Sequence, residues 1–173
     1  MSEHPYFLLN CPNQIGKLLL TPCPGTLNTN IEEALRSLKN AGAIAVLTLM
    51  SEEEMHRHNV SELNTTCEAL QLEWFHLPID DEGAPEEAFE KCWIKLSKSI
   101  HHYLNNDKAV VVHCKGGSGR TGVVAARLLI ERGLSVGDAM SQIKSLRPNA
   151  FSHDVQVRYI ENFAQSPKRN VGE

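Results

Sequence analysis

The stretch Ala109-Val-Val-Val-His-Cys-Lys-Gly-Gly-Ser-Gly-Arg-Thr-Gly122 decides how this chain folds. Its β-branched run, residues 110–112, predicts a buried strand, and the apolar residues that follow Gly119 predict a helix that runs to Arg132. The glycine-rich turn between them can point its backbone N–H groups inward, and the new helix adds the positive end of its dipole. The turn is therefore a candidate site for phosphate or sulfate.

Two side chains make that candidate anion site a reactive one. Cys114 begins the turn, where the inward N–H dipoles, the helix end and Arg120 all favour the thiolate over the thiol. Arg120 offers a planar pair of N–H donors that can hold two oxygens of a tetrahedral anion. The same guanidinium can stabilise the charge of a phosphoryl group during transfer. The turn thus predicts a nucleophile and an anion clamp in one loop.

The residue types and spacing of this loop resemble the cysteine-dependent protein tyrosine and dual-specificity phosphatases. Their signature, His-Cys-x-x-Gly-x-x-Arg-Ser/Thr, is met by His113, Cys114, Gly117, Arg120 and Thr121. The simpler interpretation, an inert buried cysteine before a flexible turn, does not account for the whole pattern. Zinc binding is disfavoured because Cys114 has no Cys-x-x-Cys partner.

The loop residues receive separate predictions. Thr121 is expected to hydrogen-bond the thiolate, as the resemblance implies, or to cap the helix. His113 is expected to orient the loop, because its side chain points away from Cys114 on an extended strand. The phosphate of a substrate is expected to lie among Lys115, Gly116, Gly117, Ser118, Gly119 and Arg120.

A second informative stretch is His76-Leu-Pro-Ile-Asp-Asp-Glu-Gly-Ala-Pro85, a shaped loop with three successive carboxylates. Hydrolysis of a phosphate ester needs a proton for the leaving oxygen, and a loop acid can supply it. The spacing Pro-Ile-x-Asp-x-x-x-Pro resembles kinase-associated phosphatase and its bacterial relatives, and this resemblance places Asp81 at the acid position. Asp80 and Glu82 remain alternatives.

A third stretch, residues 147–156, resembles the Arg-Pro-Gly-Ala segment of the same family. The resemblance implies that Gln156 positions the water that attacks phosphocysteine, although an ordinary surface glutamine is the alternative. Asn149 replaces the family's usual glycine, which is tolerable because asparagine also adopts left-handed backbone conformations.

Length and composition restrict the class of protein. The chain has 173 residues, 42% of them hydrophobic, and fits one catalytic domain over residues 1–166 with a polar tail over residues 167–173. Its net charge of −4 argues against a nucleic-acid partner. No stretch approaches the length of a membrane span, and five cysteines without paired spacing suit a reducing compartment, so we expect a cytoplasmic protein. Cys23 is expected to be a partly buried loop cysteine or a thiol that captures oxidised Cys114.

Hydrophobic periodicity predicts the remaining elements. Strands are expected over residues 6–9, 17–20, 43–49 and 73–77, with a turn over residues 11–16 between the first two. Helices are expected over residues 30–40, 65–70, 85–105 and 135–146, with a short helix after Ser51 and a final one that includes Tyr159. The fold class predicted is α/β, a single phosphatase-like domain with a central twisted, mostly parallel sheet of four or five strands flanked by helices.

The function predicted is hydrolysis of phosphotyrosine, and of phosphoserine or phosphothreonine, in proteins through a phosphocysteine intermediate. The expected partner is a phosphorylated protein or peptide; the sequence says nothing about oligomeric state. No cofactor or metal is expected, because the arginine and the loop dipoles compensate the charge. The alternatives are a phosphoinositide or inositol phosphate phosphatase, which Lys115 mildly favours, and a phosphate-binding pseudoenzyme scaffold.

Overall fold

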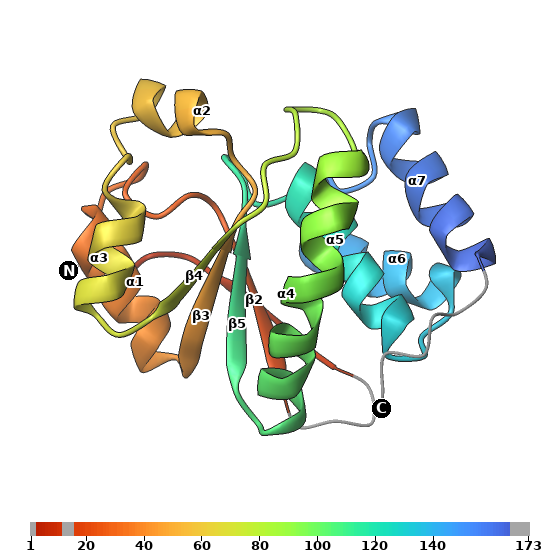
Figure 1. Cartoon of the computed structure of the whole chain (residues 1–173), viewed down its shortest axis with the longest axis horizontal. Helices are drawn as coiled ribbons and strands as arrows, with labels where there is room; N and C mark the ends of the chain where they lie inside the picture. The colour runs from red at the N-terminus through yellow and green to blue at the C-terminus, as the bar shows by residue number, and fades with distance from the viewer. Residues whose placement is uncertain (1–2, 12–15, 167–173) are drawn as a thin grey trace.

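Five strands form one mixed sheet in the order β1-β2-β5-β3-β4, in a computed structural model that describes residues 3–11 and 16–166 (Figure 1). Only the edge strand β1 is antiparallel to its neighbour, and the other adjacent strands pair in parallel. The strands are β1 (Phe7–Asn10), β2 (Lys17–Thr21), β3 (Ala43–Thr48), β4 (Glu73–His76) and β5 (Ala109–His113).

The central strand β5 is buried on both faces, as its unbroken apolar sequence predicts. Its side chains alternate between two cores: Val110 and Val112 face one core, and Val111 faces the other. The first core lies under the helices that follow β4 and β5, and the second lies under the helices of residues 31–40 and 63–69, which pack on the other face of the sheet.

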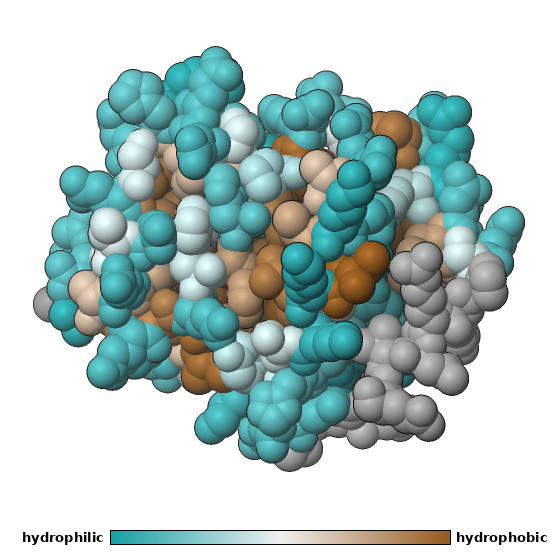
Figure 2. Space-filling view, viewed as in Figure 1, coloured by the Kyte–Doolittle hydropathy of each residue, from teal (hydrophilic) through white to brown (hydrophobic). Residues whose placement is uncertain are grey.

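Helices cover both faces of the sheet (Figure 1). Helices α4 to α7 lie on one side of the sheet, while α1 and α3 lie on the other. The helices are α1 (Ile31–Asn40), α2 (Glu52–Arg57), α3 (Leu63–Ala69), α4 (Glu87–Asn105), α5 (Gly119–Glu131), α6 (Val136–Leu146) and α7 (Asp154–Gln165). Over the α4 side the surface is mainly hydrophilic, with apolar side chains visible between the charged ones (Figure 2).

The carboxyl ends of the parallel strands align at one edge of the sheet. Thr21 of β2 and Thr48 of β3 both pair with His113 of β5, and Thr48 also pairs with His76 of β4. The loops that leave these strands therefore meet at one end of the molecule, which is where α/β folds bind ligands. That end is the top of Figure 1, where α2, the loop between β4 and α4, and the start of α7 come together.

The predicted fold class is confirmed: the chain is an α/β domain with a five-stranded, mostly parallel sheet between two layers of helices. Helix and strand bounds differ from the predicted ones by one or two residues, as helix and strand ends commonly do. Most of the predicted turn at residues 11–16 lies outside the described residues, as does the predicted polar tail, residues 167–173. Among the described helices, none combines the length and the apolar character that crossing a membrane requires.

Candidate active site

Strand β5 delivers Cys114 into a tight loop, residues 114–120, that ends in the first turn of α5; we call it the phosphate loop. Gly117 has a φ of 75°, and a Cβ there would lie 2.5 Å from the carbonyl carbon of Thr21. A side chain at Gly117 would therefore be strained by its backbone and would also collide with the end of β2. The glycine lets the loop pack directly on the chain that follows β2.

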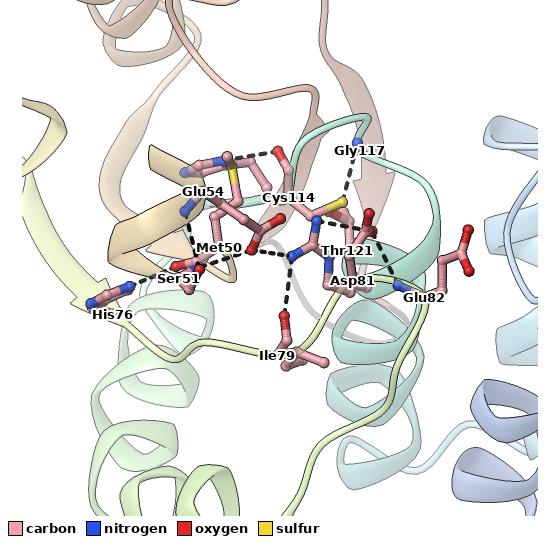
Figure 3. Close-up of polar contacts among 12 residues, drawn as sticks. Met50, Ser51, Glu54, His76, Ile79, Asp81, Glu82, Cys114, Gly117 and Thr121 are labelled. Carbon is pink, nitrogen blue, oxygen red and sulfur yellow. Dashed lines mark hydrogen bonds and ion pairs between the residues drawn. The ribbon is translucent and has the colours of Figure 1, made fainter. Parts of the chain in front are cut away.

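The sulfur of Cys114 is almost fully buried and accepts two hydrogen bonds from the loop (Figure 3). The backbone N–H of Gly117 donates to Sγ at 3.3 Å, and the hydroxyl of Thr121 donates to it at 3.2 Å. Both are donors that stabilise negative charge on sulfur. The alternative role of Thr121 as a helix cap is wrong, because the N-cap residue of α5 is Ser118 and the Thr121 hydroxyl faces the sulfur instead.

Arg120 is buried beside the sulfur and fixed by three oxygen atoms. Its Nη1 donates to Oε2 of Glu54 at 2.9 Å and to the carbonyl of Ile79 at 3.1 Å. Its Nη2 lies 3.2 Å from Oδ1 of Asp81. Burial alone would lower the pKa of Arg120, but Glu54 raises it, so the guanidinium stays charged.

Glu54 was not identified as a site residue from the sequence. It forms the predicted capping box with Ser51 at the start of α2, and its carboxylate reaches Arg120 as well as the Ser51 backbone. Burial opposes ionisation of Glu54, but the hydrogen bonds from Arg120 and from the Ser51 backbone lower its pKa below the ordinary value. The capping pattern was the only local signal, and it does not distinguish a solvated cap from one that also binds an arginine.

The loop between β4 and α4, residues 77–86, brings carboxylates to the same place; we call it the acid loop. Asp81 and Glu82 line the pocket above Cys114, whereas Asp80 does not line it and is exposed. The side chain of Asp81 is 74% exposed, and its contact with Arg120 is the ion pair given above. Of the three successive carboxylates at residues 80–82, Asp81 is the one that contacts the guanidinium.

His113 lies beneath the phosphate loop, fully buried, and does not face the pocket. One ring nitrogen, Nδ1, lies 3.2 Å from the carbonyl of Cys114, and the other, Nε2, lies 2.7 Å from Oγ1 of Thr48. A carbonyl can only accept, so Nδ1 carries the proton and Nε2 accepts from Thr48, whose oxygen in turn accepts from the indole of Trp74. Burial lowers the pKa of His113 to about 4, so the ring is neutral at pH 7.

Arg147 is a second residue whose contacts were not predicted. It clamps the outer side of the phosphate loop: Nε donates to the carbonyl of Gly117 at 3.0 Å, and Nη2 donates to the carbonyl of Gly116 at 2.7 Å. Its guanidinium stacks over the ring of Phe7, with 4.4 Å between its carbon and the ring centroid. When those carbonyls are held outward, the N–H groups of the loop are left to face the pocket.

Gln156 lies in the first turn of α7 and is completely buried, so its interpretation as a surface glutamine is wrong. Its Nε2 donates to the carbonyl of Gly83 in the acid loop at 3.1 Å. A Cβ on Gly119 would lie 3.3 Å from the same nitrogen, so the amide packs directly on the start of α5.

Most of the predicted site residues line one pocket of about 290 Å³ over the phosphate loop. His113, Gly117 and Thr121 lie outside its lining and contact the loop or the sulfur from behind. The lining residues are Asp81, Glu82, Cys114, Lys115, Gly116, Ser118, Gly119, Arg120, Asn149, Ser152, His153 and Gln156.

Cys23 is fully rather than partly buried. Its backbone N–H donates to the carbonyl of Lys115 at 3.0 Å, which ties the loop after β2 to the phosphate loop. Burial raises the pKa of the Cys23 thiol to about 12, although Lys115 opposes that shift. The thiolate form that would capture oxidised Cys114 is therefore scarce at neutral pH.

The sequence of the chain is similar to a known protein family and to known phosphatase-related proteins. The family described as "Polymorphic toxin system, DSP-PTPase phosphatase" matches residues 24–134. The chain is 30% identical over 150 residues to protein tyrosine phosphatase type IVA 3 of Mus musculus, covering 87% of this chain and 78% of that protein. It is 26% identical over 163 residues to cyclin-dependent kinase inhibitor 3 of Rattus norvegicus, covering 92% of this chain and 76% of that protein.

The fold is also found among solved structures. A kinase associated phosphatase whose catalytic cysteine is replaced by serine superimposes with a TM-score of 0.82 at 23% identity, over 94% of this chain and 95% of that one. At that identity the match concerns the fold.

Proposed function

The chain belongs to the DSP-PTPase family and is a cysteine-dependent protein phosphatase, and from that membership we propose which of its residues perform the reaction. Cys114 is the nucleophile, Arg120 and the phosphate-loop amides bind the phosphoryl oxygens, and Asp81 is the general acid. One observation carries this assignment: the Cys114 sulfur lies at the base of the pocket, with N–H and O–H donors aimed at it and the Arg120 guanidinium beside it.

In the first step the Cys114 sulfur forms a bond to phosphorus while the ester P–O bond breaks. Asp81 gives its proton to the departing alcohol or phenol, and Arg120 with the loop amides holds the remaining oxygens. In the second step Asp81 takes a proton from the attacking water, and phosphate leaves as the thiolate is restored. Thr121 assists this departure by hydrogen-bonding the sulfur, and Gln156 positions the water, as the family resemblance implies.

Asp81 is assigned as the acid in preference to Asp80 on geometric grounds. Asp81 lines the pocket and contacts Arg120 at 3.2 Å, so it is near the position that a leaving oxygen would occupy. Arg120 and the loop dipoles supply the positive charge that the transferring phosphoryl group needs, so the scheme requires no metal ion and predicts insensitivity to EDTA.

The substrates proposed are phosphotyrosine and phosphothreonine or phosphoserine in proteins. The relatives named above include a protein tyrosine phosphatase, which supports a protein substrate. Lys115 at the pocket keeps inositol phosphates as the alternative. We propose a cytoplasmic location, because all five cysteines are free thiols and a catalytic thiol requires a reducing compartment.

The decisive experiment compares hydrolysis of p-nitrophenyl phosphate by the wild type, Cys114→Ser and the matched control Cys92→Ser, which alters an exposed cysteine on α4. We expect Cys114→Ser to be inactive and Cys92→Ser to keep full activity. Acid quenching of the wild type during turnover should trap phosphate on the peptide that contains Cys114. Activity that survives Cys114→Ser would overturn the covalent mechanism.

Substrate class is tested with the wild type on phosphotyrosyl peptides, phosphothreonyl peptides and soluble inositol phosphates. A higher kcat/KM on the peptides is expected. Preference for the inositol phosphates would contradict the proposed protein substrate while leaving the covalent mechanism intact.

A further inference from the structure

Gln156 is placed to do more than hold a water. Its side chain is completely buried, and Nε2 donates to the carbonyl of Gly83 at 3.1 Å while packing on the start of α5 at Gly119. The amide therefore bridges the acid loop and the phosphate loop. Its Oε1 is buried and has no hydrogen-bond partner within residues 3–11 and 16–166, so it is free to accept from a water or a substrate.

The carbonyl that Gln156 holds belongs to the turn that carries the general acid. The N–H of Gly83 donates to the carbonyl of Asp80 at 2.8 Å, and the N–H of Glu82 donates to Oδ1 of Asp81 at 3.0 Å. A four-residue turn closed in this way moves as a unit, so a contact at Gly83 also fixes Asp81. The side chain of Asp81 is largely exposed and is held by this turn and by its ion pair with Arg120.

A polar cluster around the buried Arg127 joins the helices that adjoin these loops. Arg127 of α5 donates from Nη1 to Oε1 of Glu90 on α4 at 2.6 Å and to the hydroxyl of Tyr159 on α7 at 2.5 Å. The Tyr159 hydroxyl also donates to the same Glu90 oxygen at 2.8 Å, so three helices meet at one triangle. We call Arg127, Glu90 and Tyr159 the three-helix cluster.

Each helix of the cluster leads to a different part of the site. Helix α5 begins in the phosphate loop, α4 begins directly after the acid loop, and α7 carries Gln156 one turn before Tyr159. The three helices lie together on one side of the sheet in Figure 1. The buried guanidinium of Arg127 therefore joins the three helices that adjoin the phosphate loop, adjoin the acid loop and carry Gln156.

The surroundings of Arg127 keep it in one position. Its Nε donates to Oε1 of Glu131 at 3.1 Å, and its guanidinium carbon lies 4.5 Å from the ring centroid of Phe163 and 5.1 Å from that of Trp93. A buried arginine is tolerated only when its donors are satisfied, and such a network rigidifies the elements that it joins.

We propose that Gln156 is a positioning residue for the general acid, holding Asp81 in place through Gly83 during the first chemical step, and that the three-helix cluster keeps Gln156 in register. This inference rests on the proposed function, since it presumes that Asp81 protonates the leaving group. In that step the Cys114 sulfur bonds to phosphorus, the ester P–O bond breaks, and the Asp81 proton goes to the leaving oxygen. Loss of the Gly83 contact lowers the fraction of molecules in which Asp81 reaches that oxygen.

The test uses kcat/KM, which reports the steps up to formation of phosphocysteine and excludes attack by water. Phenyl phosphate has a poor leaving group that needs the acid, whereas 2,4-dinitrophenyl phosphate has a good one that does not. We expect Gln156→Met, which keeps the volume but has no N–H, to lower kcat/KM on phenyl phosphate about tenfold and on the dinitrophenyl ester less than about twofold. The matched control Gln142→Ala alters an exposed glutamine on α6 and should change neither.

The cluster is tested by a double-mutant cycle. Tyr159→Phe removes only the shared hydroxyl, and we expect it to lower kcat/KM on phenyl phosphate about threefold in the wild type. In the Gln156→Met background it should have no further effect, because the contact it supports is already lost. Tyr6→Phe, at a partly exposed tyrosine before β1, is the control, and thermal unfolding verifies that each variant is folded.

Two results would overturn the proposal. Equal kcat/KM for Gln156→Met and wild type on both esters, with a lower kcat and accumulation of phosphocysteine, would restrict Gln156 to the water step. Additive effects of Tyr159→Phe and Gln156→Met on kcat/KM would show that the cluster does not act through Gln156. Asp81→Asn serves as the reference. If Asp81→Asn lowers kcat/KM equally on both esters, the proposed general acid is wrong. If Asp81→Asn lowers kcat/KM more on phenyl phosphate and Gln156→Met does not, only the positioning role fails.

Discussion

Lowering the pH should destabilise the folded protein through His113, and the size of the effect follows from the structure. Burial lowers the pKa of His113 to about 4 from an ordinary value of 6.5. The ring is therefore protonated below pH 6.5 in the unfolded chain, whereas in the folded chain it stays neutral until the pH falls to about 4. The contribution of His113 to stability is complete above pH 6.5 and is lost as the pH falls through this window.

The magnitude is obtained from the two pKa values. Integration of the linkage relation gives a loss of about 2 kcal/mol between pH 7 and pH 5, and of about 3 kcal/mol once the pH reaches 4. His4, whose pKa is also lowered by burial, adds a loss of the same sign. The wild type alone does not isolate His113, so the comparison must be made with a variant.

The assay is urea unfolding of wild type and His113→Asn at pH 7, 6 and 5. Asparagine can still donate to the Cys114 carbonyl but does not titrate, so the variant should be less stable at pH 7 and lose about 2 kcal/mol less than wild type on going to pH 5. His58→Asn, at an exposed histidine, should follow the wild-type pH dependence. Parallel pH dependence of wild type and His113→Asn would refute the reasoning, because it would mean that His113 takes up its proton equally in both states.

Three further predictions concern the site. Asp81→Asn should lower kcat/KM on phenyl phosphate about a hundredfold while Asp80→Asn stays within about twofold; equal, small losses would show that neither is the acid. Glu54→Gln neutralises the anion that holds the catalytic guanidinium and should lower kcat/KM about 10- to 100-fold, whereas Glu52→Gln on the exposed side of α2 should not; the same rate in both variants would count against a positioning role. Thr121→Val should lower kcat about tenfold with kcat/KM little changed, seen as a larger pre-steady-state burst; loss of both parameters together would contradict a role in the second step.

The fold class was accessible from the sequence because its signals are local. The valine run before Cys114, the glycine turn and the apolar helix after it are contiguous, and alternation of helices and strands predicts a mostly parallel sheet. The order of the strands could not be predicted. β5 pairs with β2 and β3, which are distant from it in sequence, and hydrophobic periodicity does not indicate which strands pair. The antiparallel edge strand β1 was likewise not specified by its four-residue pattern.

The candidate site divides in the same way. Cys114 and Arg120 lie in one loop, so their spacing alone suggests their chemistry. Glu54 and Arg147 come from other elements. In the sequence, Glu54 is typical of a helix cap and Arg147 of the end of a helix, so neither indicates a contact with the site. Gln156 illustrates the limit most clearly, because an amphipathic helix pattern gives no reason to expect a polar residue that is completely buried.

The position of β5 at the middle of the sheet has a consequence for biosynthesis. Its partners β2 and β3 precede it in the sequence and do not pair with each other. The central part of the sheet therefore forms only when β5 inserts between them. β5 can pair only after residues 109–113 have been synthesised, and pairing between strands so distant in sequence is slow. Cys114 directly follows β5, so a chain in which β5 is not yet paired has no assembled phosphate loop, and catalytic activity requires the central strand to be in place.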